Sequence, residues 1–169
     1  LQCEAGCNPQ PAGPPGAGGL QASNLLAGER TDLEFCFYDH DTGDAVGLNA
    51  FGFNFHDFDN GGTVREGLVA YDVQKYATSD SFDPPIASQL EVTESDNGVK
   101  FVSTERGYGT DNAQDPSNLD DLQQSRMVQI EFWSKSCVTL TLELNVTEAV
   151  NYQCMPHRSP IPRLQRICL

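Results

Sequence analysis

The ten residues 137–146 read CVTLTLELNV and alternate strictly between apolar and polar side chains. The apolar members fall on one face of the predicted strand: Val138, Leu140, Leu142, Leu144 and Val146. The polar face carries Cys137, Thr139, Thr141, Glu143 and Asn145. This period of two is typical of an antiparallel strand with one face in the core and the other in water.

Similar strand-like runs recur along the chain. They cover residues 33–38, 51–55, 64–71, 90–94, 99–104 and 127–133. Asn97-Gly98 between two of them is the sequence signature of a tight hairpin, and a single short helix is expected to begin at Asp115. We therefore predict an all-β fold: a β-sandwich or jelly roll of about seven to eight antiparallel strands, with an extended arm and tail.

The composition divides the chain into three parts. Residues 1–28 form a Pro/Gly-rich N-terminal arm, residues 29–148 the β-sandwich domain, and residues 149–169 a basic C-terminal tail with cysteine and proline. No run of apolar residues is long enough to span a bilayer. The chain begins with Leu1 and has no signal-like stretch, so we expect a mature secreted form whose signal peptide has been removed.

The charge is strongly acidic and unevenly distributed. The net charge is −14, which makes nucleic acid and anionic membranes poor partners. Between Glu29 and Glu148 there are 23 acidic and 7 basic residues, whereas the tail after Glu148 has no acid and three arginines. These are Arg158, Arg163 and Arg166. They are the candidate assembly residues, because a basic tail can dock on an acidic body; a disordered, solubilising tail is the alternative.

Six cysteines in a chain without a CxxC pair indicate disulfides and an oxidising compartment. They are Cys3, Cys7, Cys36, Cys137, Cys154 and Cys168. The first two lie in the arm and the last two in the tail. Strand parity places Cys36 opposite Phe35 and Phe37, and Cys137 on the polar face of its strand. We therefore expect both thiols on the outside, each holding a terminal segment; Cys36 facing the core is the alternative.

Two acidic turns suggest calcium as a cofactor. The first contains Asp39, Asp41 and Asp44, and the second contains Asp57 and Asp59. Alternating carboxylates on a glycine-containing turn can supply the oxygen ligands that calcium prefers. Neither turn completes an EF-hand, and ordinary turn residues are the alternative. A transition-metal site is a further alternative at His40 and His56, each of which is beside aspartates.

Enzyme signatures are missing from the sequence. It contains no HExxH, no GxSxG and no phosphate-binding glycine loop. The six cysteines can all pair, so none stands out as a nucleophile. We therefore expect a protein that is not an enzyme, although a pair of glycosidase-type carboxylates among 24 acids is not recognisable from sequence.

Other features suggest contact with glycans. Asn145-Val146-Thr147 is a glycosylation sequon, in agreement with secretion. Trp133 lies opposite the Val128, Ile130 and Phe132 face; if Trp133 is outside, it predicts a sugar platform or a subunit interface, and a core position is the alternative. Three tyrosines are further candidates: Tyr71, Tyr76 and Tyr108. The long polar segment 105–121 is the candidate recognition loop.

Three runs resemble a known type of domain. They are residues 37–43 (FYDHDTG), 66–71 (EGLVAY) and 101–112, which includes GYGTDN. Together they resemble a secreted β-rich domain in surface proteins of microalgae and other protists, over residues 33–146. The resemblance implies a cell-surface or extracellular-filament setting, and it implies no catalytic residues.

These observations favour a non-enzymatic, extracellular structural protein. We expect a subunit of a cell-surface filament, appendage or coat that self-associates through its arm and tail and is locked by disulfides. The alternative is a monomeric module for carbohydrate binding or adhesion, with or without calcium dependence, in which arm and tail fold back on the same chain.

Overall fold

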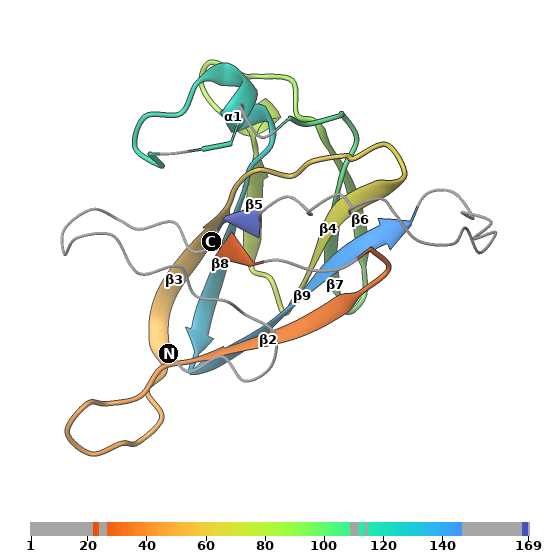
Figure 1. Ribbon diagram of the computed structural model, residues 1–169. Coiled ribbons are helices and arrows are strands. Elements are labelled where there is room, and N and C mark those ends of the chain that lie inside the picture. The colour runs from red at the N-terminus through yellow and green to blue at the C-terminus, as the bar shows by residue number, and fades with distance from the viewer. Residues whose placement is uncertain (1–21, 24–26, 109–111, 114, 147–166, 169) are drawn as a thin grey trace, which may run out of the picture.

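The computed structural model describes residues 22–23, 27–108, 112–113, 115–146 and 167–168, with only the backbone of the first and last pairs. In this part of the chain, eight strands form two antiparallel sheets packed face to face (Figure 1). The predicted all-β sandwich is confirmed. A further pair of two-residue strands, β1 (Ala22–Ser23) and β10 (Ile167–Cys168), brings the end of the arm beside the end of the tail.

The larger sheet has five strands in the order β2-β9-β4-β7-β6. Their bounds are β2 (Arg30–Cys36), β9 (Cys137–Val146), β4 (Val64–Tyr71), β7 (Gly98–Ser103) and β6 (Leu90–Ser95). The smaller sheet has the order β3-β8-β5, with β3 (Leu48–Phe55), β8 (Val128–Lys135) and β5 (Lys75–Thr78). The seven predicted strands all form, and β5 is the one that the sequence missed, because four residues are too few to show a period.

The core lies between the two inner faces. The even-numbered residues of β9 from Val138 to Leu144 are buried there, as the alternation predicted. They face Phe55 of β3 and Ile130 and Phe132 of β8, none of which is exposed. Each such side chain contributes roughly 1.5–3 kcal/mol through burial of apolar surface.

Aromatic side chains close one side of the sandwich. Phe35 packs on Phe53 with ring centroids 4.9 Å apart, and Phe37 packs edge-on against Phe51 at 4.6 Å. These contacts join β2 and the residue after it to β3, which belong to different sheets. The three phenylalanines of β3 therefore share the core-facing side, as their spacing predicted.

The β6–β7 hairpin turns at Asn97-Gly98, in agreement with the sequence signal. Gly98 has a φ of 154°, and a Cβ on it would collide with the carbonyl oxygen of Ala70 in β4. Glycine is needed here because the neighbouring strand approaches too closely for any side chain.

The one α-helix of the described residues is short and displaced from its expected start. It is α1 (Asp121–Ser125), capped by Asp120, whose side chain accepts from the Gln123 backbone N–H at 2.8 Å. The Gln123 side chain in turn accepts from the Asp120 N–H, completing a capping box. Asp115, the expected cap, instead accepts from the Ser117 N–H in a preceding turn. No helix in the described part is long and apolar enough to cross a bilayer.

Candidate functional site

Trp133 stands on the outer face of the three-stranded sheet. Its side chain is 51% exposed, so the outside position, not the core alternative, is the correct one. Its cross-strand partner on β3 is Ala50, and Gly52 pairs with Glu131 two residues further along. A Cβ on Gly52 would approach the Ile130 carbonyl oxygen to 2.9 Å. The indole is therefore flanked on β3 by Ala50 and Gly52, which are too small to cover it, and by the half-buried Leu48 on the other side of Ala50.

Polar side chains continue this face away from the tryptophan. In strands, alternate residues share a face, so Gln129 and Glu131 lie on the same side of β8 as Trp133. Asn54 of β3 is opposite Gln129, and Lys75 of β5 is opposite Glu131. The face therefore combines one aromatic ring with amide, carboxylate and ammonium groups.

A groove of about 470 Å³ opens beside this face, between the start of β5 and the β6–β7 hairpin. Its lining runs over residues 72–76 and 94–99. The Tyr76 hydroxyl donates to Glu94 Oε1 at 2.6 Å, which links the edge strands of the two sheets. The Glu94 carboxylate is the main reason that the pKa of Tyr76 is raised, since it stabilises the protonated phenol.

The first acidic turn, between β2 and β3, is exposed and organised by its own backbone. Asp39 Oδ1 accepts from the N–H groups of Asp41 and Thr42, both at 2.9 Å. These two bonds lower the pKa of Asp39, because they stabilise its ionised form. His40 is fully exposed and lies 3.2 Å from Asp41. Asp44 is also exposed, and its backbone N–H donates a hydrogen bond to the Thr42 hydroxyl.

The second acidic turn is buried instead. Asp57 and Asp59 follow the end of β3 and are 4% and 0% exposed. Because the first turn precedes β3 and the second follows it, the two are separated by an eight-residue strand, roughly 26 Å long. The five aspartates therefore form two separate groups, and calcium binding at either stays a prediction.

Sequence reasoning missed Glu66 and Arg126, which lie beside the second turn. Asp59 Oδ1 accepts from Arg126 Nη1 at 2.8 Å, and Glu66 Oε2 accepts from the Asp59 backbone N–H at 3.0 Å. Burial raises the pKa of Glu66 to about 8, and the charges of Asp59 and Asp57 act in the same direction. His56 is also buried, which lowers its pKa. These buried side chains hold the end of the sandwich together, and they do not form a binding surface.

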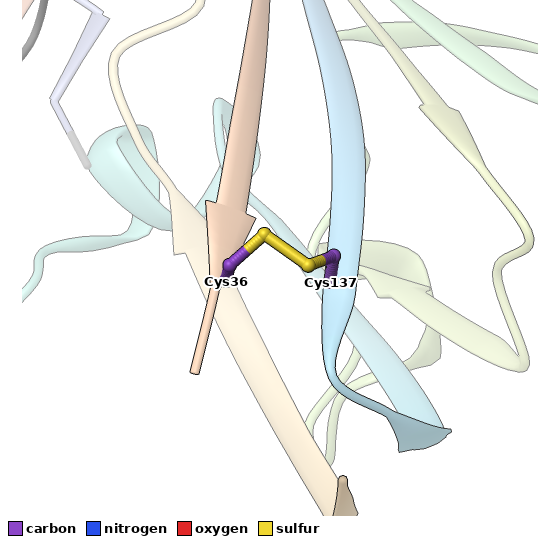
Figure 2. Close-up of a disulfide and its surroundings, with 2 residues drawn as sticks. All are labelled: Cys36 and Cys137. Atoms are coloured by element: carbon purple, nitrogen blue, oxygen red, sulfur yellow. A yellow bond between two sulfur atoms is a disulfide. The ribbon is translucent and has the colours of Figure 1, made fainter. Parts of the chain in front are cut away.

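Cys36 and Cys137 form a disulfide with each other (Figure 2). They are register partners on the adjacent strands β2 and β9, with Cα atoms 4.1 Å apart. Both lie on the outer face, as parity predicted, but the expectation that each holds a terminal segment is wrong. Glu34 has an oxygen near both sulfurs, yet bonded sulfurs are not thiolate ligands for a metal.

The structure describes the side chains of only some of the remaining predicted residues. Asn145 pairs with Arg65 of β4, and its Nδ2, the atom that would carry a glycan, is buried 2.9 Å from where a Cβ on Gly67 would lie. The other candidates fall outside the residues whose side chains the structure describes. They are Cys3, Cys7, Cys154, Cys168, Arg158, Arg163 and Arg166.

Comparison of the chain with protein-family models, curated proteins and solved structures finds no match. The resemblance to protist surface domains therefore stays a prediction.

Proposed function

We propose that this chain is a non-enzymatic extracellular module that binds glycans on the Trp133 face. The exposure of Trp133 on a sheet face of small and polar side chains is the observation that supports it. An indole presents a flat apolar surface, against which the C–H groups of a sugar ring can stack. The amides and charges alongside can pair with its hydroxyls.

The surroundings of Trp133 favour a sugar over a protein partner. Protein interfaces need a contiguous apolar core of several side chains. In the described part of the chain the other large exposed apolar residues belong to other segments: Tyr38, Tyr108, Leu122 and Val146. A lone aromatic ring among hydrogen-bonding groups is better matched to one sugar ring.

The disulfide supports the extracellular part of this proposal. The Cys36–Cys137 bond links adjacent strands on the outside of the sandwich, and such bonds persist where thiols are not kept reduced. Glycans of a cell wall or cell coat are available in the same compartment. The acidic charge of the chain also disfavours nucleic acid as a ligand.

The test is binding of the full chain to a glycan array before and after Trp133→Ala. We expect the wild type to bind at least one glycan class and the variant to lose that binding. Tyr38→Ala is the matched control, because Tyr38 is 63% exposed in the β2–β3 turn, away from the sheet face. An array signal that Trp133→Ala leaves intact would refute the proposal.

Assembly into a filament or coat is a second candidate. Its support is the contrast between the acidic body and a tail with three arginines, together with four edge strands, since β2 and β6 flank one sheet and β3 and β5 the other. Sedimentation of the full chain without reductant tests it. Concentration-dependent polymers that dissolve at high salt would support assembly, and a monomer at all concentrations would exclude it.

A further inference from the structure

The groove between β5 and the β6–β7 hairpin is continuous with the Trp133 face. Lys75 pairs with Glu131 at the start of β5, on the same outer face as Trp133, and it also lines the groove, whereas Val73 packs on the core. The Gln74 N–H donates to the Glu131 carbonyl at 3.0 Å, which holds this segment against β8. Residues 73–75 line the groove. The groove therefore begins about one strand spacing, ~4.8 Å, from the tryptophan strand.

The groove carries more negative than positive charge. Asp72, Glu94 and Asp96 line it, with Lys75 as the only cation among its lining residues. Two of the carboxylates are held in place. Glu94 accepts the Tyr76 hydroxyl, and Asp72 is paired with Lys135 at 2.9 Å. Lys135 is two residues beyond Trp133 on β8, so this ion pair also joins the groove wall to the tryptophan strand.

We propose that a glycan stacked on Trp133 extends into this groove, and that the groove selects a neutral oligosaccharide over an anionic one. This inference rests on the proposed function and names the ligand class. Ionised carboxylates accept hydrogen bonds and donate none, so they pair with sugar hydroxyls. Uronate or sulfate groups would face like charges at Glu94 and Asp96, which costs affinity.

The fluorescence of Trp133 is a direct readout, because it is the only tryptophan in the sequence. The full chain is titrated with four hexasaccharide probes: cellohexaose, laminarihexaose, chitosan hexamer and oligogalacturonate. At low salt we expect a saturable change with at least one of the two neutral probes. The oligogalacturonate should bind about tenfold more weakly, the effect of one unfavourable charge contact near a protein surface.

The variant Glu94→Gln/Asp96→Asn tests the role of the groove. We expect it to fold and to bind oligogalacturonate nearly as well as the neutral probe, because the repelling charges are gone. Glu34→Gln/Asp44→Asn removes the same charge at positions outside the groove lining and should keep the tenfold preference.

The outcomes separate the two proposals. No response to any glycan, here and on the array, would overturn both. Strong binding of oligogalacturonate by the wild type would overturn the groove inference and leave the Trp133 platform standing. The same holds if the preference survives in Glu94→Gln/Asp96→Asn, or if chitosan hexamer alone binds.

Discussion

Arg126 and Asp59 meet inside the sandwich, where the guanidinium Nη1 donates to the carboxylate Oδ1 over 2.8 Å. The two residues are 4% and 0% exposed and come from segments 67 positions apart. The same guanidinium donates from Nε to the Gln89 side chain at 2.7 Å and from Nη2 to the Arg106 carbonyl at 2.9 Å. One side chain thus ties four segments together at the end of the fold.

Arg126→Met should destabilise the protein by about 3–5 kcal/mol. The substitution keeps an unbranched apolar stem but leaves the Asp59 carboxylate buried without its cation. Urea denaturation followed by far-UV circular dichroism measures the free energy of unfolding. Lys135→Met is the matched control, because its pair with Asp72 is more exposed and should contribute less than about 1 kcal/mol. Equal losses in the two variants would contradict the assigned role of Arg126.

Glu66 should make the protein less stable as the pH rises from about 4.5 to about 8. Its pKa is raised to about 8 in the folded protein from an ordinary value of 4.5, so folding favours the protonated form. The contribution to stability is complete below pH 4.5 and is lost as the pH rises through 8. Glu66→Gln keeps an acceptor for the Asp59 N–H and removes the titration.

The measurement is the free energy of unfolding of wild type and Glu66→Gln at several pH values. Relative to the wild type, we expect the free energy of unfolding of the variant to rise across this pH window, by on the order of 5 kcal/mol in total. His56 acts in the opposite sense, because its lowered pKa costs stability as the pH falls below 6.5. Both proteins contain His56, so their difference isolates Glu66. A difference that is constant with pH would show that Glu66 titrates normally.

The fold was predictable because its signals are local. The alternation from Val138 to Leu144 follows from the burial of one face of the strand. The Asn97-Gly98 turn follows from the backbone conformation that these two residues favour. Both signals can therefore be recognised in a few consecutive residues of the sequence. The sequence did not predict β5, because four residues are too few to show the alternation of a strand. The helix was misplaced because Asp115 and Asp120 are equally good caps by composition, and only the Gln123 partner of Asp120 distinguishes them.

The sites were less predictable because they depend on pairing between distant segments. Cys36 and Cys137 could be assigned to the outer face, but their register across β2 and β9 decides that they bond to each other. Asp57 and Asp59 read as turn residues, and the burial of Asp59 depends on its ion pair with Arg126, 67 positions further along the chain. A groove between two edge strands has no sequence signal of its own.

Gly107→Ala should destabilise the protein by about 1–3 kcal/mol, although alanine is a small residue. A Cβ at this position would collide with the Asp59 carboxylate, which is held by Arg126 and has little room to move. Thermal unfolding is the simplest measurement. Gly47→Ala is the control, since nothing lies within 4 Å of a Cβ there and the change should be close to neutral. If both variants melt together, the packing of Gly107 on Asp59 is not a constraint.

Removal of the disulfide should weaken the domain without changing its fold. Cys36→Ala/Cys137→Ala opens a loop closed over a sequence separation of 101 residues, so the unfolded chain gains conformational freedom. We expect a loss of about 2–4 kcal/mol in the free energy of unfolding, with an unchanged far-UV spectrum. Mass spectrometry of a non-reduced digest checks the pairing directly. It should contain the Cys36–Cys137 linked peptide, and a link from either cysteine to Cys3, Cys7, Cys154 or Cys168 instead would restore the hypothesis that the sandwich anchors its arms covalently.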